Sequence, residues 1–274
     1  MTRLASIVLV TLLPVQAGSG AGSIPGPVQA AAVDAQDDPA DLRRRAATGD
    51  ARAQLELGQR YEAGVPPFPF DQVEAARWYR RAAESGHAGA QVNLATMYLE
   101  GHGVRRDVAQ AVTWYRAAAA QGNTMAQLEL AMLYDTGAGD LRPDAAVAAT
   151  WLHRAAARGL APAQKRLGDL YREGRGVPLD LRAAATWYRR AADQGDADAQ
   201  TELGRLLAGQ TRLADPVEAH KWLNLAASRG AHAAQRARAT RLRDELAARM
   251  NEGQLLEAYR RAAEWHDTVG AGRP

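Results

Sequence analysis

The residue types that carry most enzyme chemistry are present in this chain, but not at the spacings that chemistry requires. The six histidines show no His-Glu-x-x-His spacing, which would place two zinc ligands on one helix face. The chain has no Cys, and therefore no disulfide, thiolate metal ligand or Cys nucleophile. We predict no catalytic residue, metal site or cofactor. The histidines are His87, His102, His153, His220, His232 and His266.

Two short stretches resemble sites at first sight and have simpler explanations. Gly101-His102-Gly103 is not followed by the residues of a phosphate-binding loop, so we interpret it as a turn. Asp37 and Asp38 form a carboxylate pair, but they precede Pro39, where a helix would start. Carboxylates are favoured at helix N-termini, so capping accounts for this pair without catalysis.

One pattern organises most of the chain, because it occurs five times. A Trp recurs at spacings of 36, 37, 36 and 35 residues, each preceded by an Asp seven residues earlier and followed by a Gly eight residues later. A period of this size is typical of solenoids built from stacked supersecondary units. The recurring residues are Trp78, Trp114, Trp151, Trp187 and Trp222, with Asp71, Asp107, Asp144, Asp180 and Asp215 before them.

Each copy divides into two predicted helices. In the first, a Leu, a Gly or Ala and a Tyr or Leu share one helical face, as in Leu57, Gly58 and Tyr61. Gly in a helix costs about 1 kcal/mol relative to Ala, so its use here predicts close approach of the second helix. A further Gly ends each first helix, where positive φ is expected: Gly64, Gly101, Gly137, Gly174 and Gly209.

The second helix of each copy starts at the Asp, which we expect to act as its N-cap. Glu74, Gln110 and Glu218 lie three residues later, as in a capping box. The tryptophans and the tyrosines Tyr61, Tyr98, Tyr134 and Tyr171 are expected to be structural, packing the helices together. A Trp151→Ala change should then cost more stability than a change at Trp265, which lies in a terminal helix.

The ends of the chain differ from the repeats. Residues 1–17 have a charged start, a short apolar run and small residues at Val15-Gln16-Ala17, as in a cleaved signal peptide. Residues 18–36, rich in Gly, Ala, Ser and Pro, predict a flexible linker. Residues 37–49 predict a capping half-repeat, residues 50–230 five repeats, and residues 231–274 C-terminal capping helices. An uncleaved N-terminal anchor is the alternative to the signal peptide.

The repeated pattern resembles Sel1-like repeats, which are related to tetratricopeptide repeats. The resemblance lies in the order Ala-x-x-Leu-Gly-x-x-Tyr, then Gly174-Arg175-Gly176-Val177, then Asp, Ala, Trp-Tyr, Ala-Ala and Gly. Copy three lacks the Val, and copy five has Leu207 in place of Tyr. The stretch His220–Ala227 with its Arg-rich tail is similar to the end of bacterial members. The resemblance implies an all-α, right-handed α-solenoid that binds proteins.

Two functions follow from this resemblance. The first is an exported, periplasmic or secreted scaffold for envelope, signalling or host-interaction complexes, with no catalysis and no stable membrane span after signal cleavage. The alternative is binding or hydrolysis of β-lactams or peptidoglycan fragments, which is linked to Cys-rich relatives; the absence of Cys weighs against it. A net charge of only +3, without a basic run that contains aromatics, argues against nucleic acid.

The related tetratricopeptide arrangement implies that exposed positions of the first helices contact the partner. In copies two and three these positions are largely apolar, and in the others they are mostly polar, as in a peptide-binding groove with a charged rim. The alternative is that the apolar members pack between neighbouring copies. The predicted partner-binding residues are Val92, Thr96, Leu99, Met125, Leu128, Met132, Asp135, Lys165, Asp169, Arg172 and Arg205.

Overall fold

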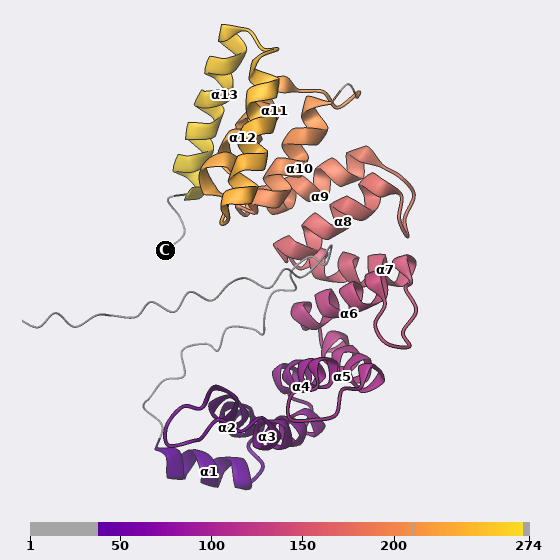
Figure 1. Ribbon diagram of the computed structural model, residues 1–274, viewed down its shortest axis with the longest axis vertical. Helices are drawn as coiled ribbons and strands as arrows, with labels where there is room; N and C mark the ends of the chain where they lie inside the picture. Colours follow the sequence, from indigo (N-terminus) through magenta and orange to yellow (C-terminus); the bar gives the residue numbers. More distant parts are fainter. Residues whose placement is uncertain (1–37, 210, 271–274) are drawn as a thin grey trace, which may run out of the picture. The chain divides into compact units, whose positions relative to one another are not determined.

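The structure is a computed structural model that describes residues 38–209 and 211–270. The predicted signal peptide and linker therefore lie outside the described residues. Within these ranges the chain forms thirteen α-helices, a short π-helical turn and no strand (Figure 1). The helices are α1 (Pro39–Ala47), α2 (Ala51–Ala63), α3 (Gln72–Glu84), α4 (Ala88–Glu100), α5 (Val108–Ala120), α6 (Thr124–Thr136), α7 (Ala145–Ala157), α8 (Ala161–Glu173), α9 (Leu181–Asp193), α10 (Ala197–Ala208), α11 (Pro216–Arg229), α12 (Ala233–Ala247) and α13 (Glu252–Trp265).

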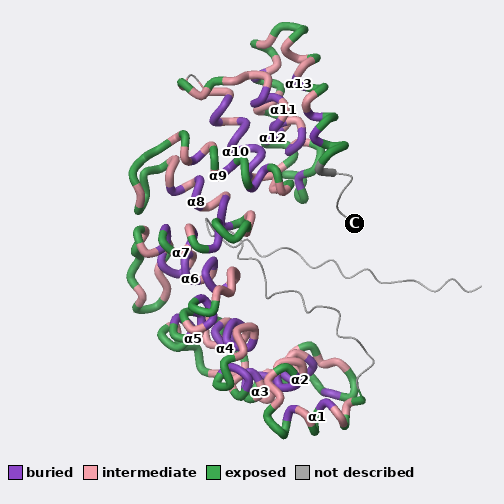
Figure 2. Tube along the Cα trace, turned by 180° about the vertical axis from the view of Figure 1, so that it is seen from behind, coloured by how far each residue is buried: buried purple, intermediate pink, exposed green. Residues whose placement is uncertain are grey.

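Successive helices pack against each other along the chain, as the repeat pattern predicts. Each even-numbered helix from α2 to α10 pairs with the helix after it, and each second helix from α3 to α9 then packs on the first helix of the next copy. Figure 2 shows that successive helices all contain buried residues. The core therefore continues from one copy to the next. The all-α solenoid prediction is confirmed.

The aspartates begin the second helices, as predicted. Each side chain accepts a hydrogen bond from a backbone amide two or three residues later, as Asp71 does from Glu74 at 3.0 Å. The capping-box prediction is wrong for Glu74, Gln110 and Glu218, because the backbone N–H of each capping Asp donates to a carbonyl oxygen of the preceding helix instead. The carboxylates of Glu74 and Glu218 accept hydrogen bonds from Arg77 and Lys221, which lie one helical turn further on.

The glycines that end the first helices behave as predicted in four copies. Gly64, Gly101, Gly137 and Gly174 have φ between +65° and +82°. In copy five the prediction is wrong, since Gly209 has φ −72° and the chain leaves α10 in an extended conformation. Gly tolerates either sign of φ, so its presence alone does not fix the turn.

A second loop glycine brings neighbouring copies into backbone contact. A Cβ on Gly103 would lie 2.0 Å from the carbonyl oxygen of Gln72, at the start of α3. A Cβ on Gly176 would lie 2.2 Å from the carbonyl oxygen of Ala145, at the start of α7. Both glycines also have positive φ, so no other residue fits these loops without strain.

In each copy the Trp and the residue that follows it pack in different places. The residue after the Trp is at most 2% exposed in all five copies: Tyr79, Tyr115, Leu152, Tyr188 and Leu223. The tryptophans of the first four copies are half-buried and pack where one copy meets the next. Arg81 covers the ring of Trp78, and arginines one turn after Trp151 and Trp187 do the same.

Both ends of the repeat array are closed by additional packing. Phe68, from the Pro-rich first loop, is 1% exposed and packs with Leu42 of α1. At the other end α13 packs on α11, where Trp265 meets Trp222 edge to face at 6.1 Å. Terminal units of a solenoid must cover the last apolar face, which these contacts do.

Candidate functional site

The residues predicted to contact a partner lie on one side of the first helices, which we call the first-helix face. It comprises the half-exposed members Thr96, Leu99, Met125, Met132, Asp135, Lys165, Asp169, Arg172 and Arg205. Two predicted members do not belong to it. Val92 is 6% exposed and Leu128 is 1% exposed, so the prediction that these side chains are open to a partner is wrong. They fill the space between consecutive copies, as the packing alternative states.

The apolar centre of the expected groove is therefore small. Leu99 packs partly on the core of copies two and three, and Met132 packs partly on the core of copies three and four. Met125, at the start of α6, is half-exposed and joins none of the core clusters of the described chain. The first-helix face thus offers isolated apolar side chains among polar ones.

In copy four the charged members of the first-helix face pair with each other, whereas Asp135 and Arg205 pair with Arg175 and Glu202 outside this face. Lys165 Nζ donates to Asp169 at 2.9 Å, and the Tyr188 hydroxyl donates to the same carboxylate at 2.8 Å. Arg172 donates to the Tyr188 oxygen at 3.1 Å. Such a network fixes the side chains in place and leaves the surface polar.

The buried tyrosines of the second helices reach this face with their hydroxyl groups. Tyr79 donates to Glu62 at 2.5 Å, and the hydroxyls of Tyr115 and Thr96 lie 2.8 Å apart. Burial, together with Glu62, raises the pKa of Tyr79 above its ordinary value. A phenol with a raised pKa stays protonated at neutral pH, so it donates hydrogen bonds and does not act as a base or nucleophile.

Glu129 on α6 is a carboxylate whose surroundings favour protonation. Burial raises its pKa to about 6, Arg166 opposes the shift and Glu100 adds to it. Glu129 lies at the same position of its copy as Asn93 and Arg166, so the corresponding side chains of neighbouring copies differ in charge.

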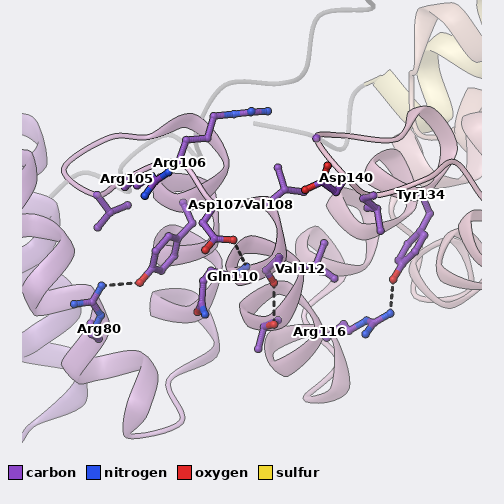
Figure 3. A pocket seen from close by; sticks show the side chains of 16 residues that line it. Arg80, Arg105, Arg106, Asp107, Val108, Gln110, Val112, Arg116, Tyr134 and Asp140 are labelled. Atoms are coloured by element: carbon purple, nitrogen blue, oxygen red, sulfur yellow. Dashed lines mark hydrogen bonds between the residues drawn. The ribbon is translucent and has the colours of Figure 1, made fainter.

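A separate pocket of about 1220 Å³ lies on the loop side of copies one to three (Figure 3). Arg80 and Arg116 reach it from α3 and α5, while Arg105, Arg106 and Asp140 come from the interhelix loops. None of the predicted partner-binding residues lines it. The sequence signal that could have indicated it is the Arg105-Arg106 pair, which occurs in one loop only.

Two arginines of this pocket, Arg80 and Arg116, are held by repeat tyrosines, as the dashed lines of Figure 3 show. Arg80 Nη2 donates to the Tyr98 hydroxyl at 2.7 Å, and Arg116 donates to the Tyr134 hydroxyl. His153 makes the corresponding contact with Tyr171 at 2.9 Å. These three tyrosines link α3, α5 and α7 to the first helix of the next copy.

A row of buried glutamines was missed by the sequence reasoning. Each donates through Nε2 to the carbonyl oxygen eight residues earlier, at 3.0 to 3.1 Å, and so joins a first helix to the end of the preceding helix. The signal was a Gln at a constant position in every copy. These residues are Gln54, Gln91, Gln127, Gln164 and Gln200.

Comparison with known proteins places this architecture in a family. The model of the Sel1 repeat matches residues 51–87, 88–123, 124–160, 161–196 and 197–230. The chain belongs to the Sel1 repeat family. A Sel1 repeat protein from Oxalobacter formigenes has a similar crystal structure, with 32% identity, 71% of this chain and 80% of that chain covered, and a TM-score of 0.66.

A second solved structure is that of c5321, a protective antigen present in uropathogenic Escherichia coli strains. It is 25% identical, with 84% of this chain and 64% of that chain covered, and a TM-score of 0.42. No curated protein matches the chain. The Sel1 repeat fold commonly mediates protein–protein interaction, and the family is generally a non-catalytic scaffold.

Among residues 38–209 and 211–270, no helix is long and apolar enough to span a bilayer. Over the same part of this Sel1 repeat chain, no three Asp, Glu or His side chains are grouped so that they could hold a metal ion.

Proposed function

We propose that this Sel1 repeat chain is an exported scaffold that binds a protein partner through its first-helix face and has no catalytic activity of its own. The observation that supports this most is the row of hydrogen-bonded side chains on that face, with Tyr188, Asp169 and Lys165 as its most connected part. Donors and acceptors held at fixed positions over several copies suit a long polypeptide surface better than an enclosed small molecule.

Export is supported by residues 1–17, with their charged start and short apolar run. It follows that the partner belongs to the envelope, to a signalling complex outside the cytoplasm, or to a host. Mass measurement of the protein in a periplasmic fraction tests this point. A mature chain that begins near Gly18 supports export, and an intact chain from Met1 in the cytoplasm contradicts it.

The binding surface is tested with Met125→Glu, since Met125 is half-exposed and outside the core clusters. The expected result is a folded protein that loses its partner in capture from envelope extract. Leu128→Glu serves as the contrast, because this side chain is 1% exposed and its replacement should unfold copies three and four. Unimpaired capture by a folded Met125→Glu protein would count against the first-helix face.

A further inference from the structure

We propose that the loop-side pocket of copies one to three binds an acidic, extended peptide segment of a protein partner. The proposal rests on the proposed function only in taking the partner to be a polypeptide. Four arginines and two aspartates line the pocket, so its formal charge is four minus two, or +2. The arginines are Arg80, Arg105, Arg106 and Arg116, and the aspartates are Asp107 and Asp140.

Three of the four arginines are fixed in position before any ligand arrives. The Tyr98 hydroxyl holds Arg80, the Tyr134 hydroxyl holds Arg116, and Arg106 Nε donates to the Leu99 carbonyl at 2.9 Å. Each of these contacts uses part of a guanidinium group that has five N–H donors in total. The remaining donors can pair with carboxylates, and a guanidinium fork matches a carboxylate well.

A comparison of the interhelix loops shows that packing does not require arginines at positions 105 and 106. At the two positions before the Asp cap, the other copies have Pro69-Phe70, Arg142-Pro143, Pro178-Leu179 and Leu213-Ala214. Copy two alone has two arginines there. Arg105 is exposed and makes none of the hydrogen bonds or ion pairs seen among the described residues. Its charge is therefore available for a ligand.

The remaining lining favours a peptide over a phosphate chain or a small anion. Asp140 can accept hydrogen bonds from the N–H groups of an extended peptide backbone, and the Gln110 side chain can donate to its C=O groups. A chain of phosphates has no such amide groups. Val104, Val108 and Leu141 supply apolar contact. The volume of about 1220 Å³ exceeds the roughly 300–1,000 Å³ typical of small-molecule pockets.

The test measures binding of a fluorescein-labelled, end-capped hexaglutamate peptide to the full chain at low salt. The wild-type protein should bind it and should not bind hexalysine. Arg105→Glu should weaken binding about tenfold or more, as expected for loss of a charge-assisted contact and its replacement by a like charge. The matched control is Arg182→Glu, which makes the same charge change at an exposed site of α9 outside the pocket and should leave the affinity unchanged.

Circular dichroism of both variants should show that they remain helical. Equal weakening by Arg182→Glu and Arg105→Glu would show a general charge effect and overturn the proposal. Tripolyphosphate binding that depends on Arg105, without any binding of hexaglutamate, would also overturn the proposal. If hexaglutamate fails to bind but the chain still captures its partner through Met125, this proposal falls and the proposed function stands.

Discussion

A Cβ atom on Gly58 would lie 2.6 Å from ring atoms of Tyr79, so the two helices of copy one approach each other through this glycine. The same relationship holds for Gly168 and Tyr188, also at 2.6 Å. It confirms the predicted close approach. It also explains why a residue that weakens helices stands in the middle of α2 and α8.

Gly58→Ala should therefore destabilise the protein. Overpacking costs about 1–3 kcal/mol, which exceeds the ~1 kcal/mol that Ala gains in helix propensity. The matched control is Gly253→Ala in α13, where a Cβ would meet only Asn251 Oδ1 at 3.5 Å. Denaturant unfolding should show a loss for the first variant and a gain of about 0.5–1 kcal/mol for the second. Equal effects of the two changes would contradict the close-approach explanation.

Glu218 on α11 is approached by basic side chains of α9 and α13. Its Oε1 accepts from Trp222 Nε1 at 2.8 Å and from Lys221 at 3.0 Å, while Arg189 and Arg261 lie within 3.5 Å of its carboxylate. Glu218→Ala removes the carboxylate partner of a buried indole N–H and of Lys221, whose side chain is only 13% exposed. We expect a loss of about 3–5 kcal/mol, the usual result of breaking a buried pair.

The control for Glu218 is Glu74→Ala, at the corresponding position of copy one. Glu74 pairs only with Arg77, whose side chain is 67% exposed. Such surface pairs contribute about 0.2–1 kcal/mol. Chemical denaturation of both variants checks the order, and a similar loss for the two would show that the charges around Glu218 contribute little.

Glu129 predicts a pH dependence that one substitution should remove. Its pKa in the folded chain is about 6, above the ordinary value of 4.5, so folded protein binds more protons than unfolded protein between these values. Stability due to this group therefore falls as pH rises from about 4.5 through 6. Glu129→Gln should stabilise the protein by about 1–2 kcal/mol at pH 8 and hardly at pH 4.

The matched control is Glu56→Gln, at the same position of copy one. Glu56 accepts a hydrogen bond from Arg60 Nη2 at 2.7 Å, so replacement of this carboxylate should not stabilise the protein at pH 8. Urea unfolding at the two pH values provides the measurement. A Glu129→Gln protein that is no more stable than wild type at pH 8 would refute the burial argument.

The burial of Trp265 reverses the order of stability losses that the sequence leads us to expect. Trp265 is 7% exposed and packs on Trp222, whereas Trp151 is half-buried. We therefore now expect Trp265→Ala to cost more than Trp151→Ala, with about 3–5 kcal/mol for the fully packed ring. Thermal or chemical unfolding of both variants decides between the two orders.

Much of the fold could be predicted because it follows from local rules. The Asp caps, the small residues at helix contacts and four of the five helix-ending glycines each depend on a few neighbouring residues. The burial of Val92 and Leu128 could not be predicted in this way. It depends on how far one copy is rotated against the next, and both faces of a first helix have similar spacing in the sequence.

The loop-side pocket was not predicted for a similar reason. Its arginines come from two second helices and one loop, and the two helical arginines, Arg80 and Arg116, are 36 residues apart in the chain. Only the packing of successive copies brings Arg80 and Arg116 to one pocket. The Arg105-Arg106 pair was visible in the sequence, but two basic residues in a loop are most often solvated surface.

The scaffold claim is tested most directly by quantitative capture of the same partner with three folded baits: wild type, Met125→Glu and Arg182→Glu. Partners are taken from envelope extract and identified by mass spectrometry. The account predicts one or more proteins retained equally by wild type and Arg182→Glu, and lost by Met125→Glu. Equal retention by all three baits, or no specific protein with wild type, would contradict binding through the first-helix face.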